Sequence, residues 1–188
     1  MTDIPPLAAF GNRIVIFGPS NSGKSTLAAA LAHKLNVPAV HLDQLHHTPF
    51  TKWVPRPTEE FHALQRQAMA GPGWVMDGNY SALTNERLAR ATGAIVLDAN
   101  HWLRLGRYFR RTLFERYRPG NLEGNKDRLN WAMIHWVAVA SRHNGARYRT
   151  MVQQTPLPHV FCNSMAEVRA LYRAWDLARQ PGPTEPSV

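Results

Sequence analysis

Residues 13–35 of the 188-residue chain read RIVIF-GPSNSGKS-TLAAALAHKL. The β-branched run at 13–17 predicts a buried strand, and the leucines and alanines after Lys24 recur at helical spacing. Between them, residues 18–25 match G-x-x-x-x-G-K-[ST] without a gap, in the strand-then-helix setting that the motif requires. The stretch therefore predicts an α/β fold with a phosphate-binding loop after its first strand.

The chemistry of phosphate binding accounts for the residue types in this loop. Gly18 and Gly23 let the backbone turn tightly, so that its N–H groups can surround an anion. Lys24 is expected between the β- and γ-phosphates, and the Ser25 hydroxyl is expected to bind Mg²⁺. A chance loop is the alternative. The predicted nucleotide-binding residues are Gly18, Pro19, Ser20, Asn21, Ser22, Gly23, Lys24, Ser25 and Thr26.

Further strands and helices alternate along the chain. Strands are predicted at 38–43, 74–77, 94–98 and 158–163. Helices are predicted from Thr58 to about residue 70, at 85–91 with Gly93 as its cap, at 101–117, at 129–142 and after the capping box at 164–167. Strands separated by helices form parallel βαβ units. We therefore expect one domain over residues 1–180 and a disordered tail at 181–188.

Three aspartates follow predicted strands, at the edge of the sheet where ligands bind in open α/β folds. An acid in such a place can hold Mg²⁺ through water or accept the proton of an attacking hydroxyl. The alternative for each is a helix cap or a turn. We favour a metal role for Asp77 and an acceptor role for Asp43. For Asp98 we favour the turn.

The loop, the Asp-Gly strand end and a late arginine-rich helix resemble the nucleoside-monophosphate kinase superfamily, which includes adenylate, shikimate and gluconate kinases. The strings HLDQLHH, WVPRPTEEF and WVMDGNY resemble bacterial adenylate kinase-like proteins labelled topology modulation or flagellar-regulator-related. The resemblance spans residues 13–175. It implies a P-loop NTPase fold with five parallel strands in the order 2-3-1-4-5, flanking helices, ATP with Mg²⁺, and a helical lid.

The resemblance also implies roles for individual residues. The implied catalytic residues are Lys24, Asp43, Asp77, Arg107 and Arg111. The implied acceptor-binding residues are Asp43, Trp53, Arg56, Asp77, Asn79 and Tyr80. The sequence departs from adenylate kinases at Ser81, where they carry an arginine after Asp-Gly-x-Pro. Asp43-x-x-His46 is instead similar to the gluconate-kinase pattern, so the expected acceptor is a nucleotide or, with some preference, a small alcohol.

The positive charge of the chain is concentrated in one segment. The chain carries 22 Lys and Arg against 13 Asp and Glu, a net charge of +9. Residues 101–150 hold eleven of these bases and three acids, a net of +8. We expect a lid at about 104–150 whose arginines stabilise the transferred phosphoryl group. The alternatives are a solvated helix face or a nucleic-acid patch, which would fit an ATP-dependent DNA regulator. A non-catalytic nucleotide sensor is a third hypothesis.

The remaining composition excludes several classes of protein. A single cysteine, Cys162, allows no disulfide framework and fits a cytoplasmic protein. The most apolar run, 131–140, is too short to span a membrane. The histidines lack metal-ligand spacing, so we expect no metal site built from them. We expect a monomer or a homodimer that binds ATP and a small molecule.

Overall fold

The computed structural model describes residues 4–51, 53–98 and 144–178. Its strands are β1 (Arg13–Phe17), β2 (Ala39–His41), β3 (Trp74–Asp77), β4 (Gly93–Leu97) and β5 (His159–Cys162). Its helices are the 3-10 helix η1 (Leu7–Phe10) and the α-helices α1 (Lys24–Leu35), α2 (Leu42–His46), α3 (Thr58–Met69), α4 (Thr84–Arg90), α7 (Asn144–Gln153) and α8 (Met165–Ala174).

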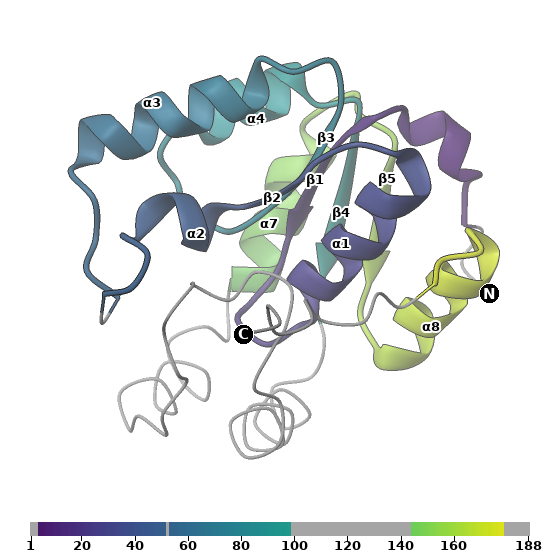
Figure 1. The fold of residues 1–188 in the computed structure, drawn as a ribbon. Coiled ribbons are helices and arrows are strands. Elements are labelled where there is room, and N and C mark those ends of the chain that lie inside the picture. Colours follow the sequence, from purple (N-terminus) through teal and green to yellow (C-terminus); the bar gives the residue numbers. More distant parts are fainter. Residues whose placement is uncertain (1–3, 52, 99–143, 179–188) are drawn as a thin grey trace, which may run out of the picture.

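The five strands form one sheet in the order β2-β3-β1-β4-β5, and each neighbouring pair is parallel. This confirms the predicted sheet and its 2-3-1-4-5 order. β1 lies in the centre, with β3 on one side and β4 on the other (Figure 1). All five carboxyl ends therefore meet at one edge, where the loop after β1 also lies.

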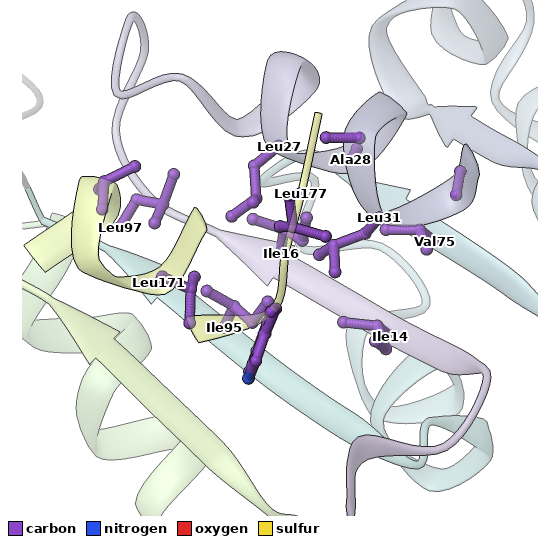
Figure 2. Close-up of a cluster of buried hydrophobic side chains, with 14 of the residues drawn as sticks. Ile14, Ile16, Leu27, Ala28, Leu31, Val75, Ile95, Leu97, Leu171 and Leu177 are labelled. Atoms are coloured by element: carbon purple, nitrogen blue, oxygen red, sulfur yellow. The ribbon is translucent and has the colours of Figure 1, made fainter. Parts of the chain in front are cut away.

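Helices cover both faces of the sheet because its strands alternate their apolar side chains between two cores. Ile14 and Ile16 of β1 face α1 and α8, whereas Val15 and Phe17 face the opposite core. Figure 2 shows the first core, in which Leu27 and Leu31 of α1 and Leu171 of α8 pack against residues of β1, β3 and β4. The second core is closed by α2, α3, α4 and α7.

The structure corrects two predicted boundaries. The second strand ends at His41, and α2 begins at once, so that Leu42 and Asp43 are helical rather than extended. Helix α3 begins at Thr58, as predicted, and no side chain caps it. Gly93 begins β4 rather than capping the preceding helix, and α4 ends at Arg90 with Ala91 at its C-cap position. In the two corrected cases the residue type fits two neighbouring positions, and strand pairing decides between them.

The C-terminal part of the chain holds one confirmed signal and one missed element. The capping box is confirmed, because Ser164 Oγ accepts a hydrogen bond from the Glu167 backbone N–H at 3.2 Å. The Glu167 carboxylate accepts from the backbone N–H of Asn163 at 2.8 Å. Helix α7 was not predicted. Its sequence, NGARYRTMVQ, begins with Asn and Gly and has only a few apolar residues.

Several predictions lie outside the described residues. These are the helices at 101–117 and 129–142, most of the lid at 104–150, and the tail at 181–188. They stay predictions. Within the described part of the chain, no helix is both long enough and apolar enough to cross a membrane.

Candidate functional site

The phosphate-binding loop joins β1 to α1 and depends on glycine at its first position. Gly18 has φ +145°, and a Cβ atom there would lie 2.2 Å from the backbone oxygen of Leu97. Gly23, just before α1, has φ +96°. Both values lie in the region that L side chains rarely adopt. The loop is therefore wedged against the end of β4, with the first turn of α1 directly behind it.

The two functional side chains predicted at the start of α1 are placed at the sheet edge. Lys24 Nζ donates to the Pro19 backbone oxygen at 3.0 Å, so its ammonium group folds back over the loop. Ser25 Oγ donates to Asp77 Oδ2 at 2.7 Å. Ser25 and Asp77 are 52 positions apart in the sequence, and the structure brings them together as the metal prediction requires.

Asp77 is the last residue of β3 and is buried, with only 5% of its surface exposed. Its Oδ1 accepts a hydrogen bond from Nδ1 of His41 at 2.5 Å. An ionised carboxylate only accepts hydrogen bonds, so Ser25 and His41 together satisfy both of its oxygens. His41 was not among the predicted site residues. The signal that could have identified it is its place at the end of a strand, two residues before Asp43.

Asn79 holds the phosphate-binding loop to the segment after β3. Its side-chain nitrogen donates to the Gly18 oxygen at 2.6 Å, and its side-chain oxygen accepts from the Gly18 N–H at 3.3 Å. The hydroxyl of Tyr148 in α7 donates to the backbone oxygen of Asn79 at 3.5 Å. Asn79 was predicted as an acceptor-binding residue, and the structure places its amide on the loop backbone.

Asp43 lies in the first turn of α2, exposed, beside the segment that follows β3. Its Oδ1 accepts a hydrogen bond from the Tyr80 hydroxyl at 2.8 Å. Burial, and after it the charge of Asp43, raises the pKa of Tyr80, so the phenol stays protonated and donates. The structure thus brings the predicted residues Asp43 and Tyr80 into contact.

A cluster of rings supports this contact. The ring of His46 lies 4.6 Å from that of Tyr80 and 4.9 Å from that of Phe61, measured between centroids. Burial, followed by the neighbouring His47, lowers the pKa of His46, so it packs as a neutral ring near pH 7. The rings tie α2, α3 and the segment after β3 together, and they fix the direction of the Tyr80 hydroxyl.

Trp53 and Arg56, both predicted to bind the acceptor, belong to the segment between α2 and α3. Trp53 packs edge-on against His47, with ring centroids 5.1 Å apart. Arg56 donates to the backbone oxygens of Gln44, Leu45 and His47 at 2.5–2.9 Å, and its Nε lies 3.0 Å from Glu60 Oε1. The structure places this guanidinium at the carboxyl end of α2, where it satisfies the carbonyl groups that end the helix.

Arg87 of α4 is a further residue that the sequence analysis missed. It is 1% exposed, donates to the Tyr80 backbone oxygen at 2.5 Å, and lies over the ring of Phe17. Burial lowers the pKa of Arg87 to about 10, so it remains charged at neutral pH. It connects α4 to the segment that carries Tyr80. The predicted lid arginines Arg107 and Arg111 lie outside the described residues.

No protein-family model matches the sequence, and no curated protein matches it. Among solved structures, the chain is similar to a candidate kinase from Chloroflexus aurantiacus J-10-fl, with a TM-score of 0.51 and 18% identity over 85% of this chain and 94% of that one. The protein has the fold of the P-loop kinases. At this identity the similarity shows the fold alone.

Two further similarities have TM-scores below 0.5. One is to shikimate kinase from Bacteroides thetaiotaomicron, with a TM-score of 0.49 and 19% identity over 86% of this chain and 97% of that one. The other is to a gluconokinase from Sinorhizobium meliloti 1021, with a TM-score of 0.42 and 18% identity over 78% of this chain and 99% of that one. The narrower resemblance to topology-modulation proteins stays a prediction.

Proposed function

We propose that this protein is a phosphotransferase that moves the γ-phosphoryl group of ATP to a hydroxyl group of a small acceptor. One observation carries the proposal. A phosphate-binding loop whose Ser25 hydroxyl is bonded to Asp77 lies at the same sheet edge as a second, exposed carboxylate, Asp43, which follows the outer strand β2. A site that only bound nucleotide would need the first of these features and not the second.

The residues of the loop fit ATP with Mg²⁺. The loop begins at Gly18, where a side chain would collide with β4, and a glycine-rich turn of this kind can wrap its backbone around phosphates. The side-chain oxygens of Ser25 and Asp77 lie 2.7 Å apart. Mg²⁺ prefers oxygen ligands and usually keeps several of its bound waters. In the proposed complex Ser25 would hold the ion directly and Asp77 would hold it through water, and the ion would supply positive charge beside the phosphates.

Asp43 is proposed to act on the acceptor. The acceptor hydroxyl oxygen bonds to the γ-phosphorus as the bond from that phosphorus to the β–γ bridging oxygen breaks, and the hydroxyl proton passes to Asp43. The products are ADP and a phosphate ester. The Tyr80 hydroxyl occupies one oxygen of Asp43 and leaves the other for the acceptor. Lys24, Arg107 and Arg111 are proposed to stabilise the transferred charge.

The proposed acceptor is a small alcohol in preference to a nucleotide. Ser81 stands four residues after Asp77, where the resemblance to adenylate kinases leads us to expect the arginine that grips an acceptor phosphate. Arg56, in the segment between α2 and α3, is held by three backbone oxygens and Glu60. Tyr80 offers a ring and a hydroxyl beside Asp43, which suit an uncharged polyol or ring alcohol.

The direct test is a screen for ADP release from ATP and Mg²⁺ with nucleoside monophosphates, sugar acids and small alcohols. We expect one class to raise ADP release well above the rate without acceptor. In Lys24→Ala, the loss of the ammonium charge from the developing phosphoryl group should reduce this rate by at least about 100-fold. Lys34→Ala, in the same helix but paired with Asp176, is the matched control and should be unaffected.

Normal turnover by Lys24→Ala would contradict the assignment of the loop. A wild-type protein that binds ATP and Mg²⁺ but releases ADP with no acceptor class would instead favour a nucleotide sensor. The two results are separable, since ATP binding can be measured by calorimetry independently of turnover.

A nucleic-acid-associated regulator, as the resemblance to topology-modulation proteins implies, is the second candidate. The net charge of +8 in residues 101–150 favours it. Binding by counterion release is strongest at low salt, so a duplex-DNA mobility shift at about 50 mM salt that weakens steeply by about 200 mM would support it. No shift at the lower salt concentration would exclude this candidate.

A further inference from the structure

We propose that His41 is a positioning residue that fixes the Asp77 carboxylate for the metal-bound nucleotide. The inference rests on the proposed function, because it concerns the same phosphate-binding loop. It adds a residue that the phosphate-loop motif does not include. His41 lies on β2, whereas Ser25 lies on α1 and Asp77 on β3.

The contacts form a chain of three side chains across the sheet edge. Ser25 Oγ donates to Asp77 Oδ2 at 2.7 Å, and His41 Nδ1 donates to Asp77 Oδ1 at 2.5 Å. The torsion that turns an aspartate carboxylate is soft, with broad preferences. A donor on each oxygen removes that freedom and sets the plane of the group. The oxygen toward Ser25 is then the one available to the metal.

The fold makes this contact short and rigid. His41 and Asp77 are paired across neighbouring strands, each at the carboxyl end of its strand, and Asp77 is also paired with Ile16 of β1. His41 is 8% exposed and Asp77 is 5% exposed. Strand pairing on both sides of Asp77 fixes its backbone, so the remaining freedom is that of the side chain, which His41 restrains.

The order of the three residues separates this arrangement from a nucleophile-activating triad. In such a triad histidine lies in the middle and takes the proton of the serine. Here the aspartate lies in the middle, and Ser25 donates to a carboxylate rather than to an imidazole. The geometry suits a metal-ligand pair with an outer partner that orients it, as histidine and carboxylate partners do in many metal sites.

The role of His41 becomes decisive when the nucleotide binds. A Ser25 hydroxyl that held the ion would do so through an oxygen lone pair and could still donate to Asp77, but its direction would then be set by the ion as well as by the carboxylate. The bond from His41 is the side-chain restraint shown by the structure that would not depend on the ion. Without it, Asp77 would have to be ordered at the moment of metal binding, which lowers affinity.

The test measures equilibrium binding of ADP with and without Mg²⁺ by calorimetry, in wild type and two variants. Asn places an amide nitrogen on Cγ, as Nδ1 is placed in histidine, so His41→Asn should keep the donor. His41→Leu removes it. We expect Mg²⁺ to strengthen ADP binding to wild type and His41→Asn. The factor by which Mg²⁺ strengthens ADP binding is the Mg²⁺ gain. In His41→Leu this factor should be about 10- to 100-fold smaller than in wild type, the usual effect of losing such a partner. Affinity without Mg²⁺ should be unchanged in both.

The matched control is His159→Leu, the same substitution in edge strand β5, where the His159 ring contacts the Leu157 backbone oxygen. It should leave the Mg²⁺ gain at the wild-type value. A gain in His41→Leu equal to that of wild type would overturn the inference and leave the proposed function standing. Equal losses in His41→Asn and His41→Leu would also overturn it. A wild-type protein whose ADP affinity does not respond to Mg²⁺ would overturn both.

Discussion

Asp43 and Asp77 are carboxylates at one sheet edge with different surroundings, and the difference supports the different roles proposed for them. Asp77 is buried, and both of its oxygens accept hydrogen bonds from Ser25 and His41. Asp43 is exposed, and its described side-chain partner is the Tyr80 hydroxyl. A buried, fully bonded carboxylate is suited to holding charge in place, whereas an exposed one has room for an acceptor.

Tyr80→Phe tests whether the hydroxyl aligns Asp43. The variant keeps the ring that packs against His46 and Phe61 and removes only the donor. We expect kcat to fall by about 3- to 10-fold, corresponding to a hydrogen bond worth about 1 kcal/mol, with the KM for ATP unchanged. Steady-state kinetics with the acceptor found by the screen measures both. Tyr172→Phe on α8 is the control. An unchanged kcat in Tyr80→Phe would show that the hydroxyl does not position Asp43.

At the scale of elements, the loop between β1 and α1 depends on its close approach to β4. Gly18 allows that approach because it has φ +145° and no side chain. Asn79 then bonds both backbone groups of Gly18 and ties the loop to the end of β3. The loop is thus held by two strands besides the one that precedes it.

Gly18→Ala tests this dependence. A methyl group at Gly18 meets the Leu97 backbone oxygen in a strained backbone conformation, so we expect the free energy of unfolding to fall by about 1–3 kcal/mol. ADP affinity should fall with it. Urea unfolding and calorimetry measure the two effects. Gly71→Ala is the matched control, because the nearest atoms to its Cβ would lie at 3.7 and 3.9 Å. Equal stability of the two variants would contradict the wedged loop.

The elements also show where sequence patterns succeed. Strong local signals, such as the β-branched run of β1 and the capping box of α8, predict their elements correctly. The end of β2 was misplaced because Leu42 and Asp43 suit either a strand or the first turn of a helix. Pairing with β3 stops at His41, and this non-local contact ends the strand.

At the scale of the whole molecule, the motif predicted the phosphate-binding loop with Ser25, and the position of Asp77 after a predicted strand indicated the carboxylate. The topology of the sheet brings the two together. His41 and Arg87 were missed because their roles depend on strand register and burial, which a single sequence does not reveal. Most of the positively charged residues 101–150 lie outside the described residues, so the role expected of their charge stays a prediction.

Cys162 provides a test of the fold as a whole. It is the only cysteine, ends β5, and is 2% exposed. Burial, and after it Glu167, raises the pKa of its thiol to about 12, so almost no thiolate exists at pH 8. We expect alkylation at pH 8 to be more than about 100-fold slower in the folded protein than in urea. Comparable rates in both conditions would contradict the packing of β5 against α8.

In the proposed reaction, Asp43 takes the proton of an acceptor hydroxyl at the phosphate-loop site. The most direct measurement follows the label from γ-labelled ATP in wild type, Asp43→Asn and the exposed control Asp176→Asn. We predict that wild type and Asp176→Asn place the label on the organic acceptor. In Asp43→Asn this transfer should slow by about 10²- to 10⁴-fold with ATP binding unchanged. Transfer by Asp43→Asn at the wild-type rate, or label released only as inorganic phosphate by wild type, would contradict the account.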